Sequence, residues 1–381
     1  MALVLNEDQQ MLQEAAIGFL AENAPVAALR HLRDEGSEDG FSRDLWKAMA
    51  DMGWAGIAVP EAYGGAEFGL VGAGIVAEEM GKNLTASPFV STAVLGAVAL
   101  SRFGSEAQKE AHLPAIAAGE QLFALAVDEG RKHAPAKTTL SAKRKGNGFT
   151  LTGTKAFVVD GHNADHLIVA ARTAGAAGDK SGITLFLVPA TATGVHRNRR
   201  DTIDSRGVAE IQFDGVDVTS DAVLGDVDQG FDALETILNA GRAVLSAEMV
   251  GHATQAFEMT VAYISERKQF GVPVGSFQAL QHRAAHLLTE IEMAKAVTLA
   301  ALQACDEHED AAIVSKSVSI AKAKVGQVAL LAAQEGIQMH GGMGMTDAFD
   351  IGLYIKRVRV AGELFGDSAF HGNRLAEALG F

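Results

Sequence analysis

The sequence is poor in several residue types, and each shortage excludes a class of protein. Cys305 is the single cysteine among 381 residues, which excludes an internal disulfide and a cysteine-rich metal site. There are 32 basic residues against 47 acidic ones, and this net charge of −15 argues against a general nucleic-acid binder. Apolar runs are shorter than the ~18 residues of a membrane span, and the N-terminus lacks a secretory signal pattern. We therefore expect a soluble, cytoplasmic protein.

The apolar periodicity changes twice along the chain. The first zone is helical, and Asn6 with Gln9 three residues later predicts a capping box at a helix start. The second zone alternates with a period of two, which predicts strands, including one over 211–218 with a tight turn at Asp214-Gly215. The third zone returns to a helical period, and we expect long helices there. Their ranges are 234–266, 277–306 and 311–339.

The predicted fold class is α+β and multidomain. We expect an N-terminal all-helical domain over 1–119, a middle β-barrel-like domain over 120–228 and a C-terminal four-helix bundle over 229–381. The chain contains no Gly-x-Gly-x-x-Gly fingerprint, no phosphate-binding P-loop and no Gly-x-Ser-x-Gly nucleophile turn. The common nucleotide-binding and hydrolase motifs are therefore absent.

Two motifs in the third zone are candidates for ligand binding. The first is Arg267-Lys-Gln-Phe270-Gly271, with Gln278 further on, where we expect a helix to end at Gly271. This motif has two interpretations. It either only ends a helix, or it also places Arg267 to pair with phosphate and stack on a planar ring. The second motif runs from Gln338 to Gly344 and contains three closely spaced glycines. It is either a helix cap or a set of backbone N–H groups exposed to a diphosphate.

These motifs, in this order, resemble the acyl-CoA dehydrogenase family of flavoproteins. The segment 45–65 and the segment 151–165 resemble the corresponding stretches of that family, so the resemblance covers nearly the whole chain. It implies FAD as cofactor, a helical, β-barrel and four-helix-bundle architecture, and a tetramer or a related dimer. It also implies acyl-CoA as substrate in lipid metabolism and an electron-transfer flavoprotein as acceptor.

The resemblance also assigns cofactor contacts. One set is expected to face the FAD of a neighbouring subunit: Arg267, Phe270, Gln278, Gln338, Gly341 and Gly342. A second set matches the segment along the flavin ring: Phe157, Val158 and Val159. Asp367 is a further candidate on the flavin side, with a solvated turn residue as the alternative.

Two segments depart from the family pattern near the expected cofactor. Val159 lacks the hydroxyl that the family usually has there, so only its backbone N–H remains to bond the ring. The family usually reads Thr-Glu-Pro followed by Gly-Ser, whereas this chain reads Asp128-Glu129-Gly130-Arg131 with no Gly-Ser after it.

The resemblance also predicts a catalytic base, which this chain does not carry at the family's positions. Family chemistry removes a proton from Cα of the thioester and passes a hydride from Cβ to flavin N5, and a positioned carboxylate takes the proton. Phe365 occupies the usual position of this glutamate. The other known position, just before an arginine on the first bundle helix, is Gly241, which precedes Arg242. Arg242 is a candidate substrate contact.

Three explanations of the missing base remain open. In the first, the chain is one subunit of a heteromer whose partner supplies the base. In the second, Asp367 or Glu248 of this chain substitutes for the glutamate. In the third, the protein catalyses a different reaction on the same fold, as a flavin monooxygenase does. A non-catalytic FAD-binding or structural subunit is a further alternative. Homo- and hetero-oligomers are both compatible with the sequence, no metal is expected, and no nucleic acid or membrane span is expected as a partner.

Overall fold

The computed structural model describes residues 4–307 and 310–381, and its packing divides the chain into two units. One unit combines the described residues up to 31 with residues 74–85 and 242–381, and the other combines residues 32–73 with 86–241. The three domain boundaries expected from the sequence stay predictions.

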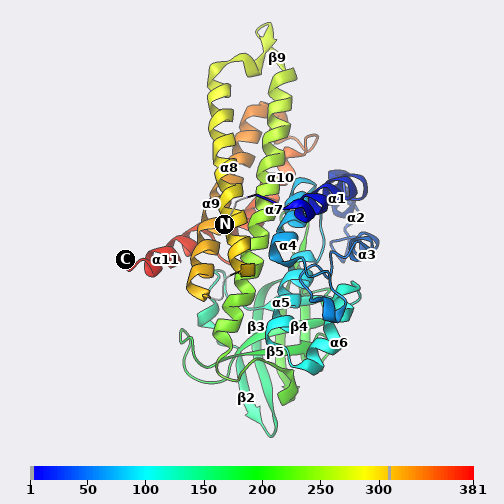
Figure 1. Cartoon of the computed structure of the whole chain (residues 1–381), viewed down its shortest axis with the longest axis vertical. Helices are drawn as coiled ribbons and strands as arrows, with labels where there is room; N and C mark the ends of the chain where they lie inside the picture. Colours follow the sequence, from blue (N-terminus) through cyan, green and yellow to red (C-terminus); the bar gives the residue numbers. More distant parts are fainter. Residues whose placement is uncertain (1–3, 308–309) are drawn as a thin grey trace. The chain divides into compact units, whose positions relative to one another are not determined.

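Helices provide most of the regular structure (Figure 1). Their bounds are α1 Glu7–Asn23, α2 Val26–Glu35, α3 Arg43–Asp51, α4 Gly69–Lys82, α5 Ala97–Phe103, α6 Glu106–Ala117, α7 Gly230–Glu266, α8 Gln278–Glu307, α9 Ala311–His340, α10 Ile351–Glu363 and α11 Ser368–Ala378. A π-helical segment, Phe89–Gly96, precedes α5. The capping box predicted at Asn6 and Gln9 is confirmed, since each side chain bonds the other's backbone N–H. No described helix is long and apolar enough to cross a membrane.

The three long helices predicted in the third zone are confirmed as α7, α8 and α9. The predicted end of α7 at Gly271 is wrong, because the helix stops at Glu266. The next residues form a two-stranded ribbon, β9 Lys268–Gln269 with β10 Val272–Pro273. Phe270 and Gly271 both have positive φ, 53° and 81°, and two such residues in succession are typical of a tight hairpin turn.

α4 and α7 pack against each other at two glycines. A Cβ added to Gly251 would lie 1.9 Å from the carbonyl oxygen of Glu78, and one added to Gly81 would lie 2.1 Å from that of Glu248. Any larger residue would force the helices apart. This close approach aligns the α7 face that carries Glu248 and His252.

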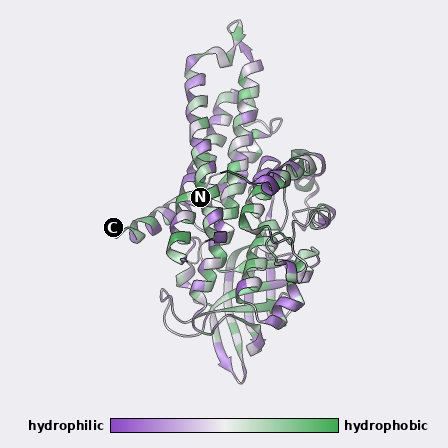
Figure 2. Cartoon of the chain, viewed as in Figure 1, coloured by the Kyte–Doolittle hydropathy of each residue, from purple (hydrophilic) through white to green (hydrophobic). Residues whose placement is uncertain are grey.

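The second unit contains one mixed sheet with the strand order β6-β7-β3-β2-β4-β5-β8, and β1 pairs with β4 in parallel. The bounds are β1 Phe123–Ala126, β2 Ser141–Lys145, β3 Gly148–Val159, β4 His166–Arg172, β5 Ile183–Pro189, β6 Val195–Asp201, β7 Gly207–Val218 and β8 Val223–Leu224. The outward end of β2 is basic and appears purple in the hydropathy view (Figure 2). The edge strand β6 carries Arg197, Arg199 and Arg200, which discourages pairing with another edge.

Two bulges interrupt the pairing of β3 with β7. The turn predicted at Asp214-Gly215 is wrong, because β7 runs through it as one strand. The register shift there places one extra residue on β7, and Gly215 absorbs it with a φ of 63°. The second bulge lies on β3, between Lys155 and Val158.

Candidate functional site

The ribbon after α7 presents a group of exposed side chains on the first unit. The side chain of Phe270 is 93% exposed, and its ring lies 6.3 Å from that of Phe277 in an edge-on arrangement. Arg267 and Gln278 are exposed and make no side-chain hydrogen bond or ion pair with the described residues. An arginine and an amide that are free in this way can bind an anionic group and a planar ring.

The glycine motif ends α9 as the sequence predicted. Gly341 has a φ of 61°, and the 3₁₀ turn Gly341–Met345 follows. No atom lies within 4 Å of a Cβ built on Gly341 or Gly342, so the backbone here is open to approach. Gln338 and both glycines are exposed. Exposed backbone N–H groups of this kind can bind a phosphate.

The bulge on β3 turns an aromatic ring out of the sheet. Lys155 pairs with Ile211 and Val158 with Ala209, so β3 carries one more residue than β7 across this step. Phe157 adopts a left-handed φ of 56° and is 44% exposed, whereas Val158 is buried. Bulges of this kind re-aim side chains next to functional sites. The exposed ring and the following backbone suit contact with a planar cofactor.

Phe365 is buried in a turn held by side chains from three helices. Its side chain is 8% exposed, and its backbone is left-handed with a φ of 57°. Arg242 on α7 donates from Nε to the Phe365 carbonyl at 2.9 Å, and His371 on α11 contacts the same oxygen through Nε2 at 3.2 Å. Arg242 itself is fully buried. An apolar ring therefore occupies a turn whose backbone is held by polar side chains.

Lys322 on α9 fixes the same turn from a further direction. Its ammonium donates to the carbonyls of Ala361, Gly362 and Gly366 at 3.1, 3.0 and 3.1 Å. These carbonyls lie at the C-terminal end of α10 and beyond it, where a cation interacts favourably with the helix dipole. Burial, with a smaller contribution from Arg242, lowers the pKa of Lys322 to about 7.

The two substitute carboxylates are both engaged in structural contacts. Glu248 is 2% exposed and receives two hydrogen bonds from Arg357, at 2.8 and 3.1 Å, with His252 at 3.3 Å. Asp367 is the N-cap of α11 and accepts from the N–H of Phe370 at 2.7 Å. Neither geometry resembles that of a carboxylate free to take a proton from a substrate.

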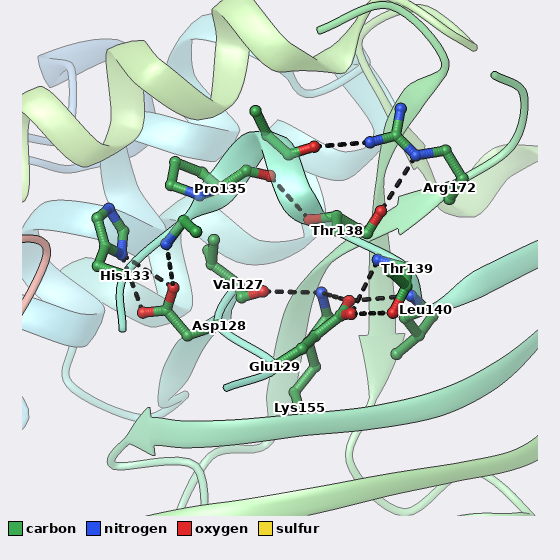
Figure 3. A network of polar contacts seen from close by, with 12 residues as sticks. Val127, Asp128, Glu129, His133, Pro135, Thr138, Thr139, Leu140, Lys155 and Arg172 are labelled. Atoms are coloured by element: carbon green, nitrogen blue, oxygen red, sulfur yellow. Dashed lines mark hydrogen bonds and ion pairs between the residues drawn. The ribbon is translucent and has the colours of Figure 1, made fainter. Parts of the chain in front are cut away.

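A polar network anchors the loop before β2 on the second unit (Figure 3). Lys155 is fully buried and donates to the Val127 carbonyl at 2.8 Å and to Glu129 at 2.7 Å. Glu129 also accepts from the N–H groups of Thr139 and Leu140, at 2.8 and 2.9 Å. Burial lowers the pKa of Lys155. The pKa of Glu129, which burial would raise, is held below its ordinary value by this ammonium and by the hydrogen bonds.

Sequence reasoning overlooked Lys322, His371 and the Asp128–His133 contact. Lys322 had a detectable signal, because it lies on the apolar stripe of α9 with Val318 and Val325, where a lysine is unusual. For His371, Asp128 and His133, no spacing in the sequence marks the contacts that they make.

The structure combines helical parts with one mixed sheet, and comparison with known proteins identifies the family. Family models for the N-terminal, middle and C-terminal domains of acyl-CoA dehydrogenase match residues 6–120, 126–216 and 228–380. The chain belongs to the acyl-CoA dehydrogenase family. It is a flavoprotein oxidoreductase acting on CH–CH groups, the family cofactor is FAD, and a tetramer is typical of the family.

Three relatives illustrate the range of similarity. "Probable acyl-CoA dehydrogenase YngJ" of Bacillus subtilis is 32% identical over 354 residues, covering 91% of each chain. The structure of a variant of the "Tcur3481-Tcur3483 steroid ACAD" is 29% identical, with a TM-score of 0.88 and 98% of each chain covered. The "ChsE4-ChsE5 complex from Mycobacterium tuberculosis" is 26% identical, with a TM-score of 0.88 over 100% of this chain and 99% of that one.

Proposed function

We propose that this chain is one subunit of a heteromeric, FAD-dependent acyl-CoA dehydrogenase whose partner subunit supplies the base. The observation that carries the proposal is Phe365, a buried apolar side chain at the family's base position, in a turn that is otherwise fully organised. A Cα–H beside a thioester is a very weak acid, and a positioned base contributes about 10²–10⁴ in rate. A chain without one therefore needs the carboxylate of another chain.

The engagement of the substitute carboxylates supports the same conclusion. Removing Glu248 from Arg357 to act on a substrate would leave a buried guanidinium without its partner, which is costly. Asp367 would have to release the first turn of α11. Two of the similar structures carry titles that name two chains together, which supports a pair of unlike subunits here as well. The word "steroid" in one title supports a bulky, ring-bearing acyl-CoA as substrate.

The exposed hydrogen-bond donors of the first unit are the proposed contacts of FAD. Arg267, Gln278, Gln338 and the N–H groups of Gly341 and Gly342 would bind the dinucleotide part of a neighbour's FAD, and Phe270 would contact it as well. Phe157, Val158 and Val159 would lie along the ring of the cofactor on this chain's own sheet. Bound FAD would supply the two-electron acceptor, and an electron-transfer flavoprotein would then take up the electrons. Arg242 would remain a candidate substrate contact next to Phe365.

Anaerobic bleaching of the flavin band by acyl-CoA esters tests the proposal. The chain is expressed alone and together with a related chain that keeps the family glutamate, and each preparation is mixed with aliphatic and ring-bearing esters. We expect a yellow lone chain that does not bleach and a complex that does. Phe365→Glu should give the lone chain slow bleaching, whereas Phe365→Gln, of similar size but without a base, should not.

Two results would overturn the proposal. One is bleaching of the lone wild-type chain as fast as that of any complex, which would point to a base within this chain. The other is oxygen uptake that depends on reduced flavin and not on an acyl-CoA ester, which would favour monooxygenase chemistry.

A further inference from the structure

Asp128 lies in the anchored loop before β2, and its backbone is fixed on both sides. The residue before it, Val127, and the residue after it, Glu129, are both bonded to the buried ammonium of Lys155 (Figure 3). The carbonyl of Asp128 accepts a further hydrogen bond from the N–H of Ala156 at 2.7 Å. Asp128 therefore has little freedom to move relative to β3.

The carboxylate of Asp128 is also held in place. Its two oxygens lie 3.0 and 2.9 Å from Nδ1 of His133, and the N–H of Ala134 donates to Oδ1 at 3.3 Å. The side chain of His133 is 3% exposed and that of Asp128 is 21% exposed. The imidazole is thus the buried member of the pair, and the carboxylate is the member that reaches the surface.

This surface adjoins the bulge on β3. Ala156, which bonds the Asp128 carbonyl, is the residue directly before Phe157, whose ring the bulge turns outward. Ala156, which is bonded to Asp128, and Phe157, which carries the exposed ring, are thus consecutive residues. A fixed carboxylate and the proposed ring-binding segment are held next to each other by the same local structure.

We infer that Asp128 tunes the electron affinity of the FAD bound against this bulge, with His133 as its positioning residue. The inference rests on the proposed function, because it requires the ring to lie along Phe157, Val158 and Val159. Reduction of FAD at neutral pH takes up two electrons and one proton, which adds one negative charge to the ring system. A carboxylate fixed nearby opposes that charge by Coulomb repulsion. Charge close to the ring is one of the ways in which a protein sets flavin potentials.

Measurement of the flavin midpoint potential in the holoprotein tests the inference. Asp128→Asn keeps the shape of the side chain and removes its charge, and Asp128→Ser removes the charge with a smaller side chain. Asp217→Asn is the matched control, since Asp217 is an exposed carboxylate of the same unit, paired with Lys145. Its ladder partner, Thr150, is six residues before Ala156 on β3, about 20 Å away at the ordinary rise per residue. Dithionite serves as reductant, with a dye of known potential as reference.

Both Asp128 variants should have a more positive potential than the wild type. We expect the ratio of affinities for reduced and oxidised FAD to rise about tenfold, which is about 30 mV for a two-electron couple. Asp217→Asn should leave the potential unchanged. Potentials of both Asp128 variants that stay at the wild-type value, or shift no more than the control, would overturn the inference.

The outcomes also separate this inference from the proposed function. If the lone chain binds FAD and bleaches with acyl-CoA, the heteromer proposal fails, but the potential measurement still decides the role of Asp128. If neither the lone chain nor a complex retains FAD against this subunit's sheet, the inference on Asp128 fails, whatever the source of the base. Thermal unfolding of each variant, followed alongside, reports any loss of folding that would release FAD for another reason.

Discussion

Nε of Arg242 donates a hydrogen bond to the carbonyl oxygen of Phe365 at 2.9 Å. The arginine therefore holds the backbone at this position and not the side chain. His371 contacts the same oxygen, and Lys322 binds the carbonyl of the next residue, Gly366. The hydrogen bonds that hold this turn therefore do not involve the side chain of residue 365.

Lys322→Met should destabilise the first unit. The substitution leaves three carbonyls, at the C-terminal end of α10 and just beyond it, without their donor, and an unsatisfied buried group costs about 1–3 kcal/mol. Relief from burying an ammonium offsets part of this, so we expect a net loss of about 2–4 kcal/mol in the free energy of unfolding. Chemical denaturation measures it. Lys316→Met, at an exposed position on the same helix, should stay within about 0.5 kcal/mol, and equal effects of the two would contradict the role of Lys322.

Acid should destabilise the protein through His371. Burial, followed by the charges of Arg242, Lys322 and Arg374, lowers the pKa of His371 to about 2 from an ordinary 6.5. Between these two values the unfolded chain binds a proton that the folded chain does not, so stability falls as the pH drops below about 6.5. The slope approaches 1.4 kcal/mol per pH unit for this one group.

His371→Gln removes this titration. The difference in unfolding free energy between wild type and variant should therefore shrink steadily from pH 7 to pH 4, as urea titrations at each pH would show. His282→Gln, an exposed histidine of α8, should keep the full slope of the wild type. A constant difference between wild type and His371→Gln across this range would show that His371 takes up a proton in the folded state.

Glu248→Gln should impair folding and leave the chemistry intact. The variant breaks a buried ion pair with Arg357, which typically costs about 3–5 kcal/mol. Glu335→Gln is the control, because its pair with Arg283 is partly exposed and should contribute at most about 1 kcal/mol. In the assembled enzyme, below the unfolding temperature, turnover with Glu248→Gln should match the wild type within a few-fold. A loss of a hundredfold or more in a folded variant would instead identify Glu248 as the base.

Arg267→Gln should weaken FAD binding without destabilising the chain. A hydrogen bond to a charged group contributes about 1.5–3 kcal/mol, so the dissociation constant for FAD should rise roughly 10- to 100-fold. Fluorescence of released flavin measures the constant. Thermal unfolding of the FAD-free protein should be unchanged because the side chain of Arg267 is exposed and makes no hydrogen bond or ion pair with the described residues. Lys268→Gln, the neighbouring cation, should change the constant less than threefold; equal effects would indicate a general electrostatic attraction.

Local signals in the sequence predicted much of the fold. The capping box of Asn6 and Gln9 and the long helical periods translate directly into hydrogen bonds between near neighbours. The predicted end of α7 at Gly271 was wrong because the turn after the helix depends on a positive φ at Phe270. Phenylalanine rarely adopts such a φ, and only the pairing of β9 with β10 imposes it. A turn was predicted at Gly215 because glycine is common in both turns and bulges. Which of the two forms depends on pairing with the partner strand β3.

In the candidate site, too, some residues were predicted from the sequence and others were not. Arg267 and the glycines after Gln338 were predicted as ligand contacts because phosphate binding needs particular residue types at a particular spacing. The assignments of these residues to FAD stay predictions. The three carbonyls bound by Lys322 are backbone groups that any residue offers, so the sequence marks the lysine but not its partners. Asp128 and His133 meet through their side chains, and no spacing in the sequence predicts that contact.

The hydrogen bonds from Arg242, His371 and Lys322 that hold the turn at residue 365 have an evolutionary consequence. Because α7, α9 and α11 shape that turn with their own side chains, a duplicated gene could lose its reactive glutamate by substitution and still encode a chain that folds. Such a copy would keep its surfaces for assembly while selection on its chemistry is relaxed. Division of labour between two sister proteins is then a short step from a homomeric ancestor.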